Sequence, residues 1–223
     1  MRHLVVVCAG TSQPSTTRML ADRIAAGSLE RLHEMELTAT VGAVEVAPLA
    51  VDVARASVTG VPSMELKAAI EQIAAADAVI AAAPVYKAGI SGLFKSFVDV
   101  LDDDLLIAKP VVLAATAGSS RHALVVDEQM RSLFAYLRAL TLPTSVFAAP
   151  EDWGAAELGE RVRRAATELA VVVQAEIEQG IVDRAWSAYR HEFGGNATRA
   201  EQTAADTDFD TPLMRLAAGG RTS

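Results

Sequence analysis

Hydrophobic residues in this chain gather in short runs, separated by longer segments in which apolar residues recur with a helical period. The first run, residues 4–9, is continuous and aliphatic rather than alternating. Such a run is typical of a strand buried on both faces of a parallel sheet. The runs that we predict to be strands are residues 4–9, 39–47, 78–83, 110–115 and 145–148.

The segments between these runs carry the pattern of amphipathic helices. In the first of them Leu20, Ile24 and Leu32 fall on one helical face. Ser63 is a suitable N-cap for the second, because its hydroxyl can accept a hydrogen bond from the helix start. The predicted helices cover residues 15–32, 63–76, 93–101, 126–140 and 158–177.

Three other segments interrupt this alternation. Residues 48–62, with Gly60 and Pro62 as breakers, are predicted to be irregular. The acidic triplet 102–104 is predicted to be a solvated helix end. Residues 181–223 differ in composition from the rest, and we expect a C-terminal extension that is partly ordered or docks on a partner subunit.

Strands that alternate with helices predict an α/β fold of three layers, with helices on both faces of a five-stranded parallel sheet. For five strands we expect the flavodoxin-like order 2-1-3-4-5, within a single domain that spans residues 1–180. In this order a ligand binds outside the carboxyl ends of strands 1, 3 and 4. Those ends carry residues 10–17, 84–92 and 116–122, which are the loops richest in Gly, Ser and Thr.

The first of these loops has the chemistry of a phosphate site. It leads from a buried strand into a helix, where unpaired backbone N–H groups and the helix dipole favour an anion. Its hydroxyls, on Ser12, Ser15, Thr16 and Thr17, add neutral donors. The patterns G-x-G-x-x-G and G-x-x-x-x-G-K-[ST] are both absent, so a single phosphate monoester is the expected ligand. The alternative is a well-capped helix start that binds nothing.

Composition narrows the classes of function. A formal net charge of -8 argues against nucleic acid as a partner. No apolar run reaches the ~18 residues that a membrane span needs, so we expect a cytoplasmic protein without a membrane partner. Cys8 is the one cysteine and is expected to pack in the first strand. The four histidines are scattered, which disfavours a metal site, and no motif of nucleophilic catalysis is present.

Three segments together resemble the NAD(P)H-dependent FMN reductases of flavodoxin-like fold, over about residues 4–180. Residues 9–18 are similar to that family's phosphate loop, G-S-x-R-x-x-S, with Gln13 near the place of the arginine and the loop one residue shorter. Residues 84–95 match P-x-Y-x-x-x-x-x-G-x-x-K, with Phe97 and Asp99 following. Residues 116–122 resemble a T-G-G-S loop in which Ala117 replaces a glycine.

The resemblance implies FMN, with its phosphate on the first loop and its ring system between the second and third. Because the arginine is missing, it also implies a flavin that is loosely held. Arg121 and His122 are the candidates for the nicotinamide nucleotide. The candidate flavin-binding residues are Thr11, Ser12, Gln13, Ser15, Thr16, Thr17, Pro84, Val85, Tyr86, Lys87, Ala88, Gly89, Thr116, Ala117, Gly118 and Ser119.

The expected function is therefore reduction of FMN by NADPH or NADH, with reduced FMN supplied to a flavin-dependent monooxygenase. Hydride transfer is the cofactor's own chemistry, so no catalytic side chain is expected. We also expect a homodimer or homotetramer. The alternatives are an FMN-containing reductase of quinones, azo dyes or metal oxyanions, a flavodoxin-like electron carrier, and a flavin-free binding domain. Trp153 is assigned either to a wall of the site or to a subunit interface.

Overall fold

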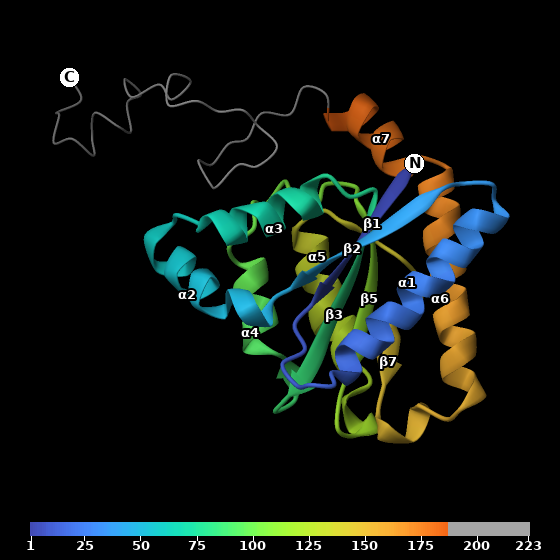
Figure 1. Ribbon diagram of the computed structural model, residues 1–223, viewed down its shortest axis with the longest axis horizontal. Helices are drawn as coiled ribbons and strands as arrows, with labels where there is room; N and C mark the ends of the chain where they lie inside the picture. Colours follow the sequence, from blue (N-terminus) through green and yellow to red (C-terminus); the bar gives the residue numbers. More distant parts are fainter. Residues whose placement is uncertain (187–223) are drawn as a thin grey trace, which may run out of the picture.

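The sheet at the centre of the molecule is parallel and has the order β2-β1-β3-β5-β6 (Figure 1). The computed structural model describes residues 1–186. The strands are β1 (Arg2–Cys8), β2 (Ala39–Glu45), β3 (Ala78–Tyr86), β5 (Pro110–Thr116), β6 (Leu140–Thr141) and β7 (Val146–Ala148). Both β6 and β7 pair with β5, so together they fill the fifth position of the sheet. The predicted order 2-1-3-4-5 is confirmed.

The strands end close together at one edge, which builds the base of the candidate site. In register, Cys8 lies opposite Ala82, Pro84 opposite Thr116, and Thr116 opposite Ala148. β3 is longer than predicted, because it continues through Pro84 to Tyr86 and there pairs with the antiparallel strand β4 (Gly89–Ile90). The second polar loop is therefore a tight hairpin.

Helices cover both faces of the sheet. α1 (Thr16–Glu34) and α6 (Ala156–Gln174) lie on one face. α2 (Ala50–Thr59), α3 (Met64–Ala74), α4 (Gly92–Val98) and α5 (Arg131–Tyr136) cover the other (Figure 1). Successive side chains of β1 alternate between the faces, so Val6 packs in the layer of α1 and α6 while Val7 packs opposite. This burial on both faces explains the continuous apolar runs.

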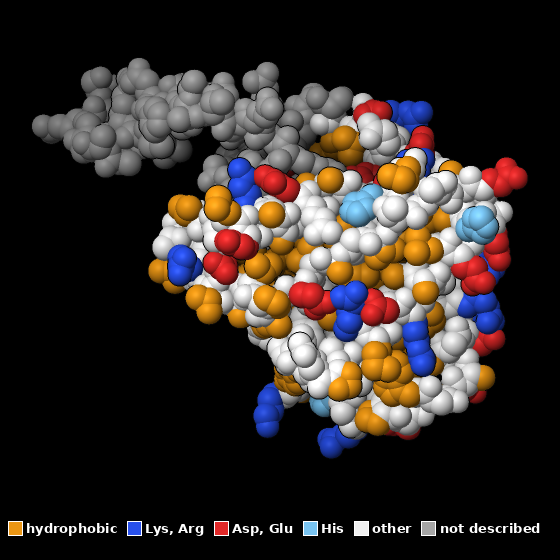
Figure 2. Space-filling view, in the orientation of Figure 1, with side chains coloured by type: hydrophobic (Ala, Val, Ile, Leu, Met, Phe, Trp, Pro, Cys, Tyr) orange, Lys and Arg blue, Asp and Glu red, His pale blue; other side chains and the backbone are white. Residues whose placement is uncertain are grey.

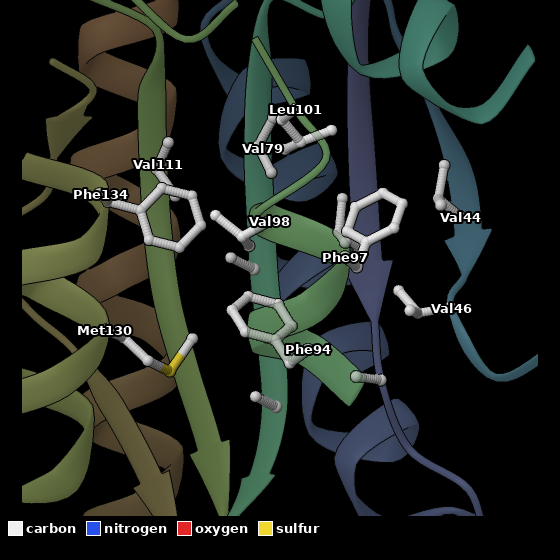
Figure 3. Packing of buried hydrophobic residues seen from close by; sticks show 14 of the residues in the cluster. Val44, Val46, Val79, Phe94, Phe97, Val98, Leu101, Val111, Met130 and Phe134 are labelled. Atoms are coloured by element: carbon white, nitrogen blue, oxygen red, sulfur yellow. The ribbon is translucent and has the colours of Figure 1, made fainter. Parts of the chain in front are cut away.

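The core on the α4 side is the one that contains the buried aromatic rings (Figure 3). Phe94 and Phe97 of α4 are fully buried, and the rings of Phe94 and Phe134 have centroids 6.3 Å apart. Met130 fills the space beside them. The core between the sheet, α1 and α6 is built from smaller side chains, which include the buried Cys8, as expected.

The prediction of an irregular segment over residues 48–62 was wrong. A short 3₁₀ turn, η1 (Ala47–Leu49), leads into α2. Val53 and Ala56, three residues apart, are buried on one side of this helix. Gly60 has φ 71° and ends the helix in the left-handed conformation, so it acts as a C-cap instead of interrupting a loop.

Figure 2 shows hydrophobic side chains gathered among charged ones over the end of the molecule formed by α2 and α3. Val58 of α2 is 87% exposed and Met64 of α3 is 83% exposed. Ser63 caps α3 as predicted, since its hydroxyl accepts a hydrogen bond from the Leu66 N–H at 3.2 Å.

The acidic triplet is not a solvated helix end. α4 stops at Val98, and the chain then passes through buried turns in which Asp102 and Asp104 are 5% and 8% exposed. The charged group at the end of the helix is instead Asp99, whose Oδ1 forms an i,i+4 ion pair with the Lys95 Nζ at 2.5 Å.

The helix predicted over residues 126–140 is also divided. It begins with a π-helical turn, η3 (Val126–Met130), and ends at Tyr136. Arg138 then adopts φ 57°, which no α-helix can accommodate, and the chain enters β6.

The C-terminal part of the described chain turns back toward the amino-terminal edge of the sheet. α6 ends at Gln174, earlier than predicted, because Glu176 is left-handed with φ 50°. α7 (Ile177–Ile181) and the π-helical turn η5 (Val182–Trp186) follow at the end of the sheet opposite the polar loops (Figure 1). Most of the predicted extension, residues 187–223, lies outside the described residues. Within residues 1–186, no helix is long and apolar enough to span a membrane.

Candidate functional site

A cavity of about 610 Å³ lies beyond the carboxyl ends of β1, β3, β5 and β7. Its volume is within the ~300–1,000 Å³ typical of ligand pockets. It lies where the strand order predicted a ligand. Its lining residues are Gly10, Thr11, Ser12, Thr16, Thr17, Pro84, Val85, Tyr86, Thr116, Ala117, Gly118, Ala148, Pro150 and Trp153.

The loop after β1 approaches the start of α1 closely enough to require glycine. A Cβ at Gly10 would lie 2.0 Å from the Ser15 Oγ. That Oγ caps the helix by accepting a hydrogen bond from the Arg18 N–H at 3.2 Å. Thr11, Ser12 and Thr16 line the cavity, whereas Ser15 and the exposed Gln13 do not.

Thr17 and Thr116 join the first and third loops beneath the cavity. Their hydroxyl oxygens are 2.6 Å apart, and the two side chains are 2% and 4% exposed. Each hydroxyl can both donate and accept, so this bond leaves one of the two protons available for another acceptor. Both residues were candidates, and the structure brings them together although 99 positions separate them in the sequence.

Tyr86 carries the second loop toward the first. Its side chain is 51% exposed, and its hydroxyl lies 3.3 Å from the Thr11 Oγ1. Pro84 and Val85 line the cavity with Tyr86, whereas the next three candidates, residues 87–89, do not. The second loop therefore contributes the end of β3 and not the tip of the hairpin.

The hairpin tip is strained and is held from behind. Lys87 and Ala88 have φ of 50° and 65°, a conformation that costs an L-residue roughly 1–2 kcal/mol. Gln129 of η3 spans the tip: its Oε1 accepts a hydrogen bond from the Ile90 N–H at 3.0 Å. Its Nε2 donates to the Ala88 carbonyl at 3.2 Å. This side chain was not among the candidates, and only its contact with the hairpin reveals it.

The third loop lines the cavity with Thr116, Ala117 and Gly118. The Ala117 N–H donates to the Ala148 carbonyl at 3.2 Å, which ties this loop to the last strand. Ser119 instead accepts from the Arg121 N–H at 3.3 Å and caps the 3₁₀ turn η2 (Ser120–His122). Ser119, Arg121 and His122 do not line the cavity.

Four lining residues were absent from the candidate list: Gly10, Ala148, Pro150 and Trp153. Three of them follow or end β7, the last strand parallel to β5. The rule that placed the other loops, that carboxyl ends of parallel strands share an edge, applies equally to this strand. Trp153, for which two roles were open, is on the cavity wall and half-buried.

None of the described residues that line the cavity is charged. Arg18, in the first turn of α1, is held away from the lining by ion pairs with Asp22, at 2.7 Å, and with Glu45. The hydrogen bond to Asp22 is the main cause that raises the pKa of Arg18. Beneath the loop, burial raises the pKa of the Cys8 thiol, so it remains protonated near neutral pH.

The loop that follows β7 contains an exposed carboxylate, that of Glu151. The pKa of Glu151 is lowered by its own backbone N–H and by a hydrogen bond from the Ser120 side chain. Within residues 1–186, no three histidine, cysteine or acidic side chains are grouped as a metal site would require.

The donor set of the cavity fits a phosphorylated ring compound. Hydroxyls and backbone N–H groups lie at the start of α1, a 19-residue helix with no acidic residue in its first turn. Tyr86 and Trp153 are the aromatic side chains among the lining residues. Neutral polar groups at one end and aromatic rings beside them suit FMN.

A family model of NADPH-dependent FMN reductases matches residues 2–154. The chain belongs to this family. The matched segment includes every residue that lines the cavity. The match confirms the resemblance drawn from the three loops, with FMN as the flavin and NAD(P)H as the electron donor, and it favours the reductase over the electron carrier and the flavin-free domain.

Individual relatives agree with the family. The reductase is 38% identical over 173 residues to the NADH-dependent FMN reductase SfnE of Pseudomonas putida, covering 74% of this chain and 88% of the relative. It is 38% identical over 154 residues to an NADPH-dependent FMN reductase of Pseudomonas aeruginosa, covering 67% and 78%. A solved oxidoreductase from Corynebacterium diphtheriae shares 42% identity and a TM-score of 0.76, covering 78% of this chain and 98% of that one.

Proposed function

We propose that the reductase binds FMN in the cavity at the carboxyl edge of the sheet, reduces it with NADH or NADPH, and releases it to a separate acceptor enzyme. The observation that carries this proposal is the lining itself: neutral donors beside the start of α1, two aromatic rings, and no charged side chain among the described lining residues. The acceptor that we propose is a flavin-dependent monooxygenase.

The phosphate is proposed to lie against the loop after β1. Thr11, Ser12 and Thr16 supply hydroxyls there, and the first N–H groups of α1 supply the rest. Gly10 keeps this loop open, since any larger residue would press on the capping hydroxyl of Ser15. Ser15 thus supports the loop, while Gln13 is exposed and does not line the cavity.

The ring system is proposed to lie between Tyr86 and the third loop. Ala117 and Gly118 are small residues and line this part of the cavity. The space beside Gly118 is open, because a Cβ on this residue would meet no protein atom within 4 Å. The Ala117 N–H is engaged with the Ala148 carbonyl, so the Gly118 N–H is the one that would stabilise negative charge developing on the flavin's pyrimidine ring. When bound, the flavin itself accepts the hydride, which explains why the site needs no acid or nucleophile.

Weak retention of the flavin follows from the neutral lining. Hydrogen bonds from neutral donors to the charged phosphate contribute about 1.5–3 kcal/mol each, and a bidentate arginine would add an ion pair to them. Without a cation at the phosphate, FMN is expected to exchange with solvent between turnovers. This is the property that a reductase supplying reduced FMN to another protein requires.

The test is flavin binding followed by turnover. Purified protein is dialysed against FMN, the bound flavin is measured by its absorbance, and oxidation of NADH and NADPH is compared at matched concentrations. We expect reversible binding and FMN-dependent oxidation of at least one nucleotide. Failure to bind FMN, or binding without oxidation of either nucleotide, would refute the proposal. Their relative rates give the donor preference, on which the relatives differ.

The oligomeric state is a further part of the proposal. We propose a homodimer or homotetramer, which light scattering of the full chain measures directly. A monomer at the concentrations used for turnover would contradict it.

A further inference from the structure

Trp153 is one of two tryptophans in the chain, and it combines three contacts. It follows the 3₁₀ turn η4 (Pro150–Asp152) at the end of β7 and lines the cavity. It also packs against the core between the sheet, α1 and α6. Finally, the guanidinium carbon of Arg23, on α1, lies 5.0 Å from the centre of its ring.

The segment that carries Trp153 is fixed by its own hydrogen bonds. Asp152 Oδ2 accepts from the Ala149 N–H at 2.8 Å, and the Asp152 N–H donates to the Ala149 carbonyl at 3.0 Å. The indole is therefore held on a braced turn and not on a free loop end.

The other tryptophan provides a comparison within the same chain. Trp186 belongs to η5 and has Arg138 at 5.6 Å from its ring centre. Both tryptophans thus have an arginine over the ring, but only Trp153 lines the cavity. An arginine over an indole is a recurring packing contact, so it is the position at the cavity that marks Trp153 for a role in binding.

We propose that Trp153 is a flavin-contacting residue of the reductase and that Arg23 is a positioning residue that holds its ring against the cavity. The inference rests on the proposed function, because it takes FMN as the ligand of this cavity. Because the phosphate is held only by neutral donors, apolar and aromatic contact with the ring system must add to retention, and Trp153 offers the larger of the two aromatic rings in the lining. Arg23, on the exposed surface of α1, keeps the indole in one orientation.

Contact between Trp153 and the flavin can be detected by the fluorescence of bound FMN. An indole touching a flavin ring suppresses flavin emission by donating an electron to the excited state, and phenylalanine cannot do this. In Trp153→Phe the bound FMN should therefore emit several times more strongly than in the wild type. Trp186→Phe is the matched control and should leave the emission unchanged.

The affinity for FMN should fall when the contact between Trp153 and the flavin is removed. An aromatic pair is worth about 0.5–1.5 kcal/mol beyond its buried area, so loss of that contact alone in Trp153→Ala should weaken FMN binding about twofold to twelvefold. Trp153→Phe, which keeps most of the packing, should weaken it less than Trp153→Ala does. Tyr86 also lines the cavity and can suppress emission, so the comparison is repeated in a Tyr86→Phe background.

Arg23 is tested by loss and rescue. Arg23→Leu should raise the emission of bound FMN by freeing the indole, and Arg23→Lys, which restores a cation over the ring, should bring it back toward the wild-type level. Arg138→Leu makes the same change beside Trp186 and should have no effect on the flavin.

The outcomes separate this inference from the proposed function. FMN bound by dialysis in every variant is the precondition, and a wild-type protein that binds none refutes the function itself. Bound FMN whose emission and affinity are the same in Trp153→Phe, Trp153→Ala and wild type overturns the role of Trp153. Emission in Arg23→Leu that is the same as in the wild type overturns the role of Arg23 and leaves that of Trp153.

Discussion

At the scale of single residues, two close contacts shape the cavity from below. Gly10 faces the capping hydroxyl of Ser15, and Thr17 is hydrogen-bonded to Thr116. The first contact fixes how near the loop comes to the start of α1, and the second fixes the loop relative to β5. Both are independent of any ligand, so they shape the cavity in the free protein.

We expect Gly10→Ala to lower FMN affinity about tenfold or more and to destabilise the protein by about 1–3 kcal/mol, as overpacking does. The new Cβ would overlap the Ser15 Oγ and displace the cap. Gly159→Ala in α6 is the control, because Gly159 does not line the cavity and a Cβ there would meet nothing within 4 Å. Flavin titration and urea unfolding measure the two effects, and equal behaviour of the two variants would contradict the argument.

The threonine pair predicts a non-additive result. Thr17→Val leaves the Thr116 hydroxyl buried without this partner and should cost about 1–3 kcal/mol. The double change, with valine at both positions, should cost less than the sum of the single changes, since no hydroxyl is then left unsatisfied. Urea unfolding of the four proteins gives the coupling energy, and strict additivity would show that the bond contributes nothing.

At the scale of elements, the hairpin between β3 and β4 is the part of the site that local sequence does not stabilise. Two-residue hairpin turns with positive φ favour Asn and Gly, yet Lys87 and Ala88 stand there. The strain is balanced by Gln129, which binds the hairpin on both sides of Gly89. The position of Tyr86 in the cavity lining thus depends on a side chain of η3, about forty residues away in the chain.

Gln129→Leu should therefore loosen the hairpin without opening the core. We expect weaker FMN binding, by about threefold to tenfold, and faster proteolysis near Lys87, because two hydrogen bonds to the tip are lost. Adding Lys87→Asn and Ala88→Gly should restore part of the affinity, since these residues adopt positive φ more readily. No restoration would mean that Gln129 acts in some other way than by holding the turn.

The same elements show what could be predicted from the sequence. The strands were visible because burial on both faces imposes continuous apolar runs, and the polar loops because parallel strands end at one edge. α2 was missed because Gly60 and Pro62 were interpreted as loop breakers, although Gly60 ends a helix. Gln129 and the pairing of Thr17 with Thr116 depend on contacts across 39 and 99 positions, for which local pattern carries no signal.

At the scale of the whole molecule, the two edges of the sheet have opposite character. The cavity lining at the carboxyl edge is uncharged, whereas the amino-terminal edge holds Arg2, Asp77, Lys109, Glu176 and Glu178. Lys109 is 1% exposed: its ammonium donates to carbonyls at the end of α3 and contacts Glu178 of α7 at 3.1 Å. This pair attaches the described end of the chain to the body of the protein.

We expect Glu178→Gln to destabilise the protein by about 2–4 kcal/mol, because it removes a charged partner from a buried ammonium. Glu176→Gln is the control: the Glu176 side chain, paired with Arg2, is 60% exposed, so the pair should contribute no more than about 1 kcal/mol. Thermal unfolding compares them, and FMN turnover at moderate temperature should be unchanged in both. Equal losses would contradict the buried role of Lys109.

The uncharged lining of the cavity also sets how the reductase responds to its solution. With a net charge of -8 on the chain and none on the described lining residues, added salt screens only a long-range repulsion between protein and phosphate. Flavin affinity should then stay constant or rise slightly with ionic strength, where a site built on arginine would lose affinity. Contacts between the charged outer surface and an acceptor protein would still vary with salt. Ionic strength could therefore control the delivery of reduced flavin while leaving its capture unchanged.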